Sequence, residues 1–243
     1  MASGGDETIV VIPAYNEQES LPAVLEELAT TVPDVAVLVV DDGSHDDTAS
    51  VTRRAGVTCV QLPFNLGIGG ALRAGYRYAT DNGYSRAVQF DADGQHRADQ
   101  IGILLAGLDD GADMVIGNRF GDQGDYSVGR SRRLAMGLLR WGVRVLAKQR
   151  FTDTSSGFRA IRRPLLDAFA SDYPVEYMDS VEALVAACRA GYRVDEVPVV
   201  MGERTGGVAS NRNARLVYHY ARLLVALLGS SGSLTPAPER SGP

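Results

Sequence analysis

The segment QFDADGQH, residues 89–96, places two carboxylates one residue apart where an apolar run ends in a glycine turn. From such a turn, Asp91 and Asp93 can face one hard cation, and Gln95 can add an amide oxygen. Oxygen ligands suit Mg²⁺ or Mn²⁺, and a bound divalent cation neutralises charge that develops on a leaving diphosphate. In the simpler alternative, Asp93 and Gly94 only form a turn and Asp91 only caps the following helix.

A second segment whose residue types could bind a ligand, IVVIPAYNE, spans residues 9–17. Pro13 ends its apolar run, Tyr15 offers an aromatic face on which a base could stack, and Glu17 offers a carboxylate for the base edge or the ribose. The alternative is a strand end followed by the helix cap Asn16, which accounts well for Asn16 and poorly for Tyr15.

Two further segments follow apolar runs in the same way. In VVDDGSHDDT, residues 39–48, either Asp41 or Asp42 can accept from a ribose hydroxyl or a base N–H, whereas Asp46 or Asp47 is expected only to cap a helix. In GNR, residues 117–119, the guanidinium of Arg119 can bind a phosphate through two parallel hydrogen bonds. A surface arginine with no ligand is the alternative there.

The pattern around these segments predicts the elements that position them. Short β-branched runs predict buried strands, over Thr8–Ile12, Val35–Val40, Val57–Leu62, Arg86–Phe90 and Met114–Gly117. A 3.6-residue period predicts amphipathic helices, over Leu21–Thr31, Asp46–Ala55, Gly69–Asn82 and Ala98–Leu108. This alternation predicts an α/β fold, with a mostly parallel sheet covered by helices on both faces. Ligands of such sheets lie at the carboxyl ends of the strands, so the segments above should converge on one nucleotide-and-metal cleft.

The second half is less regular. We expect helices over 132–148, 165–169, 180–190 and 214–228, and a strand over 193–199 whose Pro198 places it at a sheet edge. One domain, residues 1–228, should be followed by a disordered tail, residues 229–243, of Ser, Gly and Pro with little else.

Composition and charge restrict the class of partner. The 243 residues are 45% hydrophobic and 22% charged, as in ordinary globular proteins, and the net charge of −6 argues against a general nucleic-acid binder. From Arg130 to Arg163, however, ten Lys or Arg stand against the single acid Asp153. This stretch therefore carries +9 and the rest of the chain −15, a field that attracts an anionic partner to one side.

The predicted basic helices also suggest a membrane surface. Each aligns cations on one face: Arg133, Arg140, Arg144 and Lys148 in the first, and Arg215, His219 and Arg222 in the last. Such helices can lie in the headgroup plane of an anionic membrane. Core helices with solvated basic edges, or a dimer interface, are the alternatives, and the oligomeric state stays open.

No targeting signal is expected from the sequence. Cys59 and Cys188 are interpreted as buried reduced thiols, and the N-terminus lacks a basic region followed by an apolar run. The longest membrane candidate, residues 214–228, falls short of the ~20 residues that a span needs. We therefore expect a cytoplasmic protein that can bind peripherally to the cytoplasmic face of a membrane.

Six segments together resemble a known family: VVIPAYNE, DDGS, NLGIGGA, DADGQH, GNR and TDTSSGFRAIRR. Their order and spacing are similar to those of the family 2 inverting glycosyltransferases of the Rossmann-like GT-A fold, in the branch with dolichyl-phosphate mannose synthase and the bacterial polyprenyl-phosphate glycosyltransferases. The resemblance covers roughly residues 8–210. It implies a metal-dependent hexosyltransferase that moves a mannose- or glucose-type sugar from a GDP- or UDP-sugar to a polyprenyl or dolichyl phosphate.

The resemblance also implies roles for individual residues. The nucleoside would be held by Pro13, Tyr15, Glu17, Val40 and Asp42. The metal and the diphosphate would be held by Asp91, Ala92, Asp93 and Gln95, and the donor phosphates also by Arg119 and Arg204. The chain departs from the dolichyl enzymes in TGGVASN, residues 205–211, and at Met136 or Gly137, where they carry a serine.

The acceptor decides which further groups the reaction needs. A phosphate acceptor is already anionic at neutral pH, so it needs cations rather than a base, and Arg119, Arg132 and Arg133 can supply them. A hydroxyl acceptor would need a base, and Asp179 is the carboxylate nearest the start of the helix predicted over 180–190. In hydroxyl-using relatives the base falls one residue later, at Ser180. The catalytic candidates are thus Asp93, Arg119 and, for a hydroxyl acceptor, Asp179.

Two rival functions are less well supported. A nucleotidyltransferase would want a glycine-rich loop with Lys or Arg after the first strand, and PAYNEQES has none. A binding module without catalysis is disfavoured by the intact carboxylate pair. NLGIGGALRAG, residues 65–75, follows the third strand, so we interpret its glycines as backbone packing beneath the nucleotide rather than as a dinucleotide fingerprint.

Overall fold

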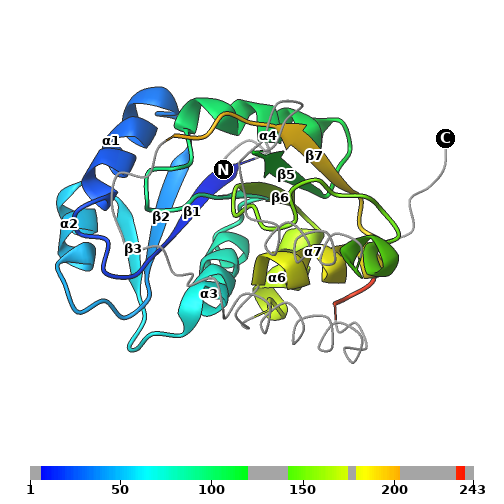
Figure 1. Ribbon diagram of the computed structural model, residues 1–243. Coiled ribbons are helices and arrows are strands. Elements are labelled where there is room, and N and C mark those ends of the chain that lie inside the picture. Colours follow the sequence, from blue (N-terminus) through cyan, green and yellow to red (C-terminus); the bar gives the residue numbers. More distant parts are fainter. Residues whose placement is uncertain (1–6, 120–141, 175–178, 203–233, 239–243) are drawn as a thin grey trace, which may run out of the picture.

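The β-branched runs form a seven-stranded sheet with helices on both faces, which confirms the predicted α/β architecture (Figure 1). The computed structural model describes residues 7–119, 142–174, 179–202 and 234–238. The strands are β1 (Thr8–Ala14), β2 (Ala36–Asp41), β3 (Thr58–Gln61), β4 (Arg86–Gln89), β5 (Met114–Asn118), β6 (Arg159–Arg162) and β7 (Val194–Pro198). Their order across the sheet is β3-β2-β1-β4-β6-β5-β7.

The sheet is mostly parallel, as predicted, and β6 is the exception. This strand runs antiparallel to both of its neighbours, β4 and β5, and the sequence analysis did not predict it. β7 pairs with β5 and lies at the edge, where its terminal Pro198 removes no hydrogen bond from an interior ladder.

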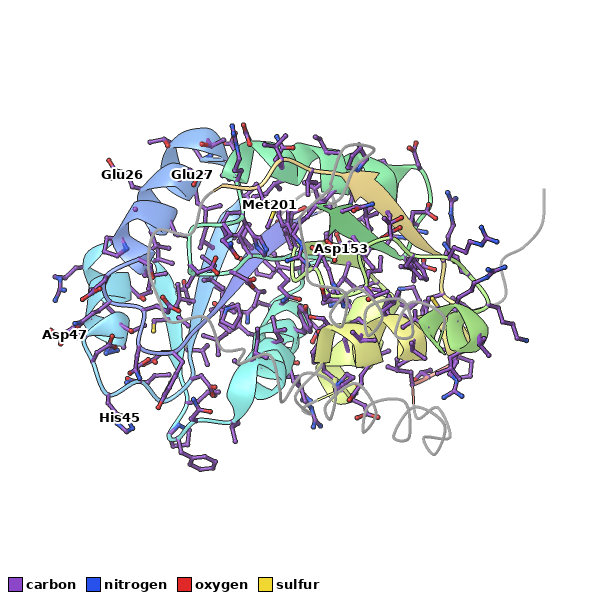
Figure 2. The ribbon with its side chains drawn as sticks, viewed as in Figure 1. Glu26, Glu27, His45, Asp47, Asp153 and Met201 are labelled. Atoms are coloured by element: carbon purple, nitrogen blue, oxygen red, sulfur yellow. The ribbon has the colours of Figure 1, made fainter. Side chains whose placement is uncertain are left out.

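The helices form two layers, one on each face. They are α1 (Leu21–Thr31), α2 (Thr48–Arg54), α3 (Gly67–Asp81), the 3₁₀ turn η1 (Ala98–Gln100), α4 (Ile101–Asp109), α6 (Leu165–Ser171) and α7 (Asp179–Arg189). One buried cluster joins α1 and α4 to the sheet, and the other joins α3, α6 and α7 to the opposite face. Glu27 of α1 accepts the N–H of Ala98 (2.8 Å), which ties α1 to the start of η1 (Figure 2).

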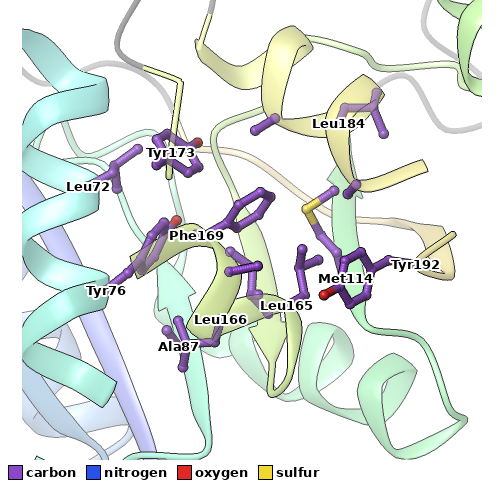
Figure 3. Packing of buried hydrophobic residues seen from close by; sticks show 14 of the residues in the cluster. Leu72, Tyr76, Ala87, Met114, Leu165, Leu166, Phe169, Tyr173, Leu184 and Tyr192 are labelled. Carbon is purple, nitrogen blue, oxygen red and sulfur yellow. The ribbon is translucent and has the colours of Figure 1, made fainter. Parts of the chain in front are cut away.

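The layer of α3, α6 and α7 is built around buried aromatic rings (Figure 3). Tyr76 of α3 stacks on Phe169 of α6 (6.2 Å), and Tyr173 meets both rings edge-on (5.4 and 5.0 Å). Each fully buried side chain of this size stabilises the fold by about 1.5–3 kcal/mol. In the same layer, a Cβ on Gly75 would lie 2.4 Å from Val11, so glycine lets α3 lie close to β1. This agrees with the packing role predicted for that glycine-rich segment.

The predicted elements of the second half are only partly covered by the described residues. Of the helix predicted over 132–148, residues 142–147 are helical, with Val143 buried and Arg144 exposed. The helix predicted over 214–228 lies outside the described residues. Within the predicted tail, residues 234–238 are described. There Leu234 is buried, Tyr192 donates to the carbonyl of Thr235 (3.0 Å), and Ala237 donates to that of Ala190.

No helix among the described residues is long and apolar enough to span a bilayer.

Candidate active site

The carboxyl ends of β1, β2 and β4 lie side by side, because the three strands are parallel neighbours. Ala14 pairs with Asp41 at the end of β2, and Val11 pairs with Gln89 at the end of β4. Three of the segments that carry the candidate residues therefore emerge at one edge of the sheet, as the sequence predicts.

The loops after β1 and β2 are joined by hydrogen bonds in both directions. The N–H of Asn16 donates to Ser44 Oγ (2.9 Å), and the N–H of His45 donates back to Asn16 Oδ1 (2.9 Å). The N–H of Glu17 donates to Thr48 Oγ1 (2.9 Å). Asn16 has a φ of 56°, which asparagine tolerates better than most residues. Asn16 thus fixes one loop against the other and is not the helix cap considered from the sequence, since the N-cap of α1 is Ser20.

The residues expected to hold the nucleoside differ in exposure. Tyr15 is 40% exposed, and its ring meets that of His45 edge-on at 6.4 Å. Pro13 and Glu17 are half-buried, and the Glu17 carboxylate accepts the Ser20 hydroxyl. Val40 is fully buried.

Asp42 is occupied by the chain itself. Its Oδ1 accepts the N–H of Leu66 (2.7 Å) just before α3. Burial raises the pKa of Asp42, against the N–H groups of Leu66 and Gly67, and the charge of Asp41 raises it further. Asp41 is also buried, and its Oδ2 has no hydrogen-bond partner within the described part of the chain.

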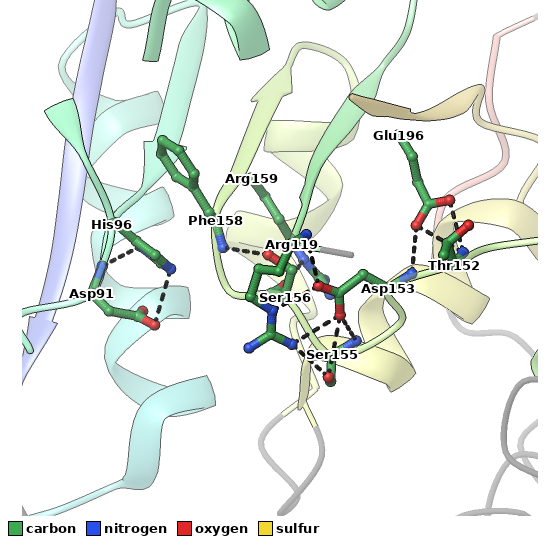
Figure 4. A network of polar contacts seen from close by, with 10 residues as sticks. All are labelled: Asp91, His96, Arg119, Thr152, Asp153, Ser155, Ser156, Phe158, Arg159 and Glu196. Atoms are coloured by element: carbon green, nitrogen blue, oxygen red, sulfur yellow. Dashed lines mark hydrogen bonds and ion pairs between the residues drawn. The ribbon is translucent and has the colours of Figure 1, made fainter. Parts of the chain in front are cut away.

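The turn after β4 is organised by the buried imidazole of His96 (Figure 4). His96 Nδ1 accepts the backbone N–H of Asp91 (2.8 Å), and Nε2 lies 3.4 Å from Asp91 Oδ2. Asp93 Oδ1 accepts the N–H of Gln95 (3.0 Å), which closes the turn. Ala92 is buried within it.

Charges from two strand ends meet around this ring. Burial lowers the pKa of His96, the charges of Asp91 and Asp93 oppose that effect, and the charge of Arg119 adds to it. Asp91 also contributes to the raised pKa of Arg119, behind the larger effect of hydrogen bonds to Asp153. Asp91 after β4 and the guanidinium after β5 therefore influence each other electrostatically, and Asp93 acts on the same imidazole.

Arg119 is oriented by a buried carboxylate that the sequence analysis assigned no role. Asp153, whose side chain is fully buried, accepts from Arg119 Nε (2.7 Å) and Nη2 (2.9 Å). Arg119 Nη2 also donates to Ser155 Oγ (2.9 Å). Burial raises the pKa of Asp153, but the hydrogen bonds and charge of Arg119 outweigh it, so the pKa lies below its ordinary value. The sequence signal for the Arg119–Asp153 pair was that Asp153 is the single acid within residues 130–163.

A second carboxylate supports the loop that carries Asp153. Glu196 of β7 accepts the backbone N–H groups of Thr152 and Asp153 at 2.8–3.0 Å. The loop before β6 is thereby fixed to the edge strand, with Asp153 near the middle of the molecule (Figure 2). The orientation of the Arg119 guanidinium therefore depends on the loop before β6 and on β7, and β6 and β7 are the two neighbours of β5 in the sheet.

The oxygen ligands proposed from the sequence fit a divalent cation. Asp91 Oδ1 is buried and has no hydrogen-bond partner among the described residues, so a lone pair remains for a ligand. Gly157 leaves the carboxylate room, since a Cβ there would lie 3.0 Å from Asp91 Oδ2. In the described ranges no group of three or more His, Cys, Asp or Glu could hold a metal. Magnesium usually takes one or two carboxylates and completes its shell with water and substrate phosphates.

Two buried polar residues behind Asp91 escaped the sequence analysis. Gln89 of β4 and Arg159 of β6 are paired across the sheet and at most 1% exposed. Neither the Gln89 amide nor the two terminal nitrogens of Arg159 has a hydrogen-bond partner in the described structure. Buried polar groups in folded proteins nearly always have a hydrogen-bond partner, so these unpaired groups are unusual. The segment of Arg159 carries no strand signal in the sequence, because RAIR, residues 159–162, places two apolar residues between two arginines and does not alternate.

The remaining candidates cannot be placed. Arg132, Arg133 and Arg204 lie outside the described residues. Asp179 is the first residue of α7, one residue before the predicted start. The chain that leads to Arg204 lies against the carboxylate turn, because the N–H of Gly202 donates to the carbonyl of Gln95 (2.8 Å).

Comparisons with known proteins show the family of the chain. The profile of the family described as "Glycosyl transferase family 2" matches residues 9–169. Polyprenol monophosphomannose synthase of Mycolicibacterium smegmatis is 33% identical over 240 residues, which cover 95% of this chain and 89% of the relative. Undecaprenyl-phosphate mannosyltransferase of Micrococcus luteus is 36% identical over 208 residues, or 82% and 85%.

A solved structure confirms the GT-A fold. Glucosyl-3-phosphoglycerate synthase from Mycobacterium tuberculosis, crystallised with Mn²⁺, UDP and phosphoglyceric acid, matches with a TM-score of 0.69 at 22% identity. The match covers 97% of this chain and 80% of that one.

Proposed function

The chain belongs to glycosyl transferase family 2, and we propose that it is a metal-dependent inverting enzyme that moves a mannose- or glucose-type sugar from a GDP- or UDP-sugar to a polyprenyl or dolichyl phosphate. The observation that carries the proposal is the placement of Asp91 and Asp93 in one turn after β4, with Asp91 3.4 Å from the buried His96, and of Arg119 just past β5, held there by Asp153. Two anions that can share a cation, beside a fixed guanidinium, suit a substrate with two phosphates and a phosphate acceptor.

The donor's nucleoside would lie on the two cross-linked loops. Tyr15 presents its exposed ring for stacking, and Glu17 lies two residues further on. The backbone near Val40, with Asp42 or the unpartnered Oδ2 of Asp41, would meet the ribose or the base edge. Since the loops are already hydrogen-bonded to each other, little ordering entropy is lost on binding.

The diphosphate would lie over the turn after β4. Asp91, Asp93 and Gln95 would hold Mg²⁺ or Mn²⁺, with Ala92 packed beneath, and the cation would neutralise charge on the leaving diphosphate. The structural neighbour with the same fold was crystallised with Mn²⁺ and UDP, which supports a metal and a nucleoside diphosphate as the ligands proposed here. Arg119 and Arg204 would contact the phosphates.

A phosphate acceptor fits the charges better than a hydroxyl. Its oxygen is anionic at neutral pH, so the step needs cations to hold it beside the donor, and no proton has to move. Arg119, with Arg132 and Arg133 from the +9 stretch, would supply them. The two relatives described above are named for polyprenol monophosphomannose and for undecaprenyl phosphate. Such lipids lie in membranes, so we also propose peripheral binding to the cytoplasmic face.

A soluble hydroxyl acceptor is the second candidate. Asp179 is the first residue of α7, one residue before the position of the base in hydroxyl-using relatives, so it is the residue to test as base for such an acceptor.

A transfer assay separates these outcomes. Purified protein with Mn²⁺ and a panel of GDP- and UDP-hexoses would be given undecaprenyl phosphate, undecaprenol, a set of soluble hydroxyl compounds or no acceptor, and the products would be identified by mass spectrometry. We expect a hexosyl phospholipid, formed with undecaprenyl phosphate and not with undecaprenol, and lost with EDTA. Transfer to a soluble hydroxyl compound, abolished by Asp179→Asn, would overturn the lipid-phosphate assignment.

A further inference from the structure

The ring of His96 is held from three directions. It stacks on Phe158 (4.8 Å between centroids, 22° between planes) and meets Phe90 edge-on (5.4 Å, 85°). Its Nδ1 accepts the N–H of Asp91 at 2.8 Å. With only 2% of the residue exposed, the ring has no room to rotate, so the direction of Nε2 is fixed.

The hydrogen bond to Nδ1 also determines the tautomer. A nitrogen that accepts a backbone N–H carries no proton of its own, so in the neutral ring the proton lies on Nε2. Nε2 lies 3.4 Å from Asp91 Oδ2, so the N–H of the neutral ring is on the side of the carboxylate, at ion-pair distance. Phe158 directly precedes β6, and Asp91 lies in the turn after β4, so the ring of His96 joins two segments of the site.

We propose that His96 is a positioning residue, which holds the plane of the Asp91 carboxylate in the orientation that binds the metal. This inference rests on the proposed function, because it takes Asp91 as a metal ligand. Carboxylates that bind metals are commonly oriented by a second hydrogen-bonding group, and loss of that group weakens metal binding. The backbone bond and the packing fix the ring, but neither depends on the proton at Nε2, so that donor can be removed while the turn is kept.

Two substitutions separate the two nitrogens of the ring. In His96→Asn the amide oxygen can replace Nδ1 as acceptor for the Asp91 N–H, but nothing reaches the place of Nε2. In His96→Gln the amide nitrogen can reach the place of Nε2, but the acceptor at Nδ1 is lost. His96→Phe keeps the stack on Phe158 and loses both polar contacts.

The test measures Mn²⁺ affinity directly, by the EPR signal of free Mn²⁺ in the presence of UDP or GDP, with thermal unfolding measured for each variant. We expect His96→Asn and His96→Phe to raise the apparent Kd for Mn²⁺ about 10–100-fold. His96→Gln should bind Mn²⁺ nearly as the wild type does, despite a lower Tm. In the transfer assay, His96→Asn should raise the KM for Mn²⁺ and recover most of kcat at saturating Mn²⁺.

Wild-type affinity in His96→Asn would overturn the inference, as would an equal loss in His96→Gln and His96→Asn, since the ring would then act only through the turn. If the wild type itself binds no Mn²⁺ with either nucleotide, or Asp93→Ala binds it equally well, the metal assignment of the proposed function is wrong. The two failures are thereby distinguishable.

Discussion

Removal of the charge on Asp153 should destabilise the fold and free Arg119 from its orientation. Asp153→Asn keeps the volume of the side chain but leaves the guanidinium without an anionic partner. Breaking a buried ion pair by removing one member costs about 3–5 kcal/mol. Asp153 is fully buried, but Arg119 is 34% exposed and water can replace part of what it loses. With the asparagine oxygen still able to accept, we expect about 2 kcal/mol, or a fall in Tm of about 4–8 °C.

The difference in stability between the wild type and Asp153→Asn should depend on pH. Because Arg119 holds the pKa of Asp153 below its ordinary 3.8, the pair stabilises the fold fully above that value. As pH falls below 3.8, the unfolded chain binds a proton that the folded carboxylate still excludes, so the advantage of the wild type over Asp153→Asn should shrink. Urea unfolding of both proteins between pH 7 and about pH 3 measures this difference.

A matched control is the exposed pair Arg77–Asp81, whose side chains are 66% and 60% exposed. Asp81→Asn should cost less than about 0.5 kcal/mol, because water screens an exposed helical pair. If Asp153→Asn is no more destabilising than Asp81→Asn at pH 7, or if its deficit grows on acidification, the reasoning about the buried pair is refuted.

The other predictions concern ligands. Asp93→Ala should abolish Mn²⁺-dependent donor binding in calorimetry while leaving Tm unchanged, and wild-type donor affinity would rule out its role as a ligand. Gly157→Ala places a Cβ 3.0 Å from Asp91 Oδ2, so metal affinity should fall, with about 1–3 kcal/mol of stability lost. Arg144→Gln with Lys148→Gln should weaken co-sedimentation with anionic vesicles by about 1 kcal/mol per charge. Binding that ignores both substitutions and rising salt would argue against membrane contact through this helix.

The fold was predictable because its signals are local. Apolar runs and 3.6-residue periods mark most strands and helices of the first half within two residues of their observed ends. β6 was missed because Arg159–Arg162 has four residues, two of them arginines inside a basic stretch, and its strand conformation depends on pairing with β4 and β5. A local sequence pattern does not show which distant segments will pair in a sheet.

The site was predictable in its residue types and less so in its contacts. The spacing of Asp91 and Asp93 suggests a ligand pair, but it does not reveal that His96 holds Asp91. The partner of Arg119, Asp153, lies 34 residues away, and only folding brings the two together. Asp42 shows the opposite case, since its carboxylate caps α3, a role that its motif does not distinguish from ligand binding.

The central claim is that the carboxyl ends of these strands form one site for a metal and a nucleoside diphosphate. Crystals grown with Mn²⁺ and GDP or UDP, measured at a wavelength where manganese scatters anomalously, test it most directly. We predict one strong anomalous peak within bonding distance of Asp91 or Asp93 and of the diphosphate, with the base against Tyr15. A nucleotide bound away from Tyr15, or a manganese peak that neither carboxylate touches, would contradict the account.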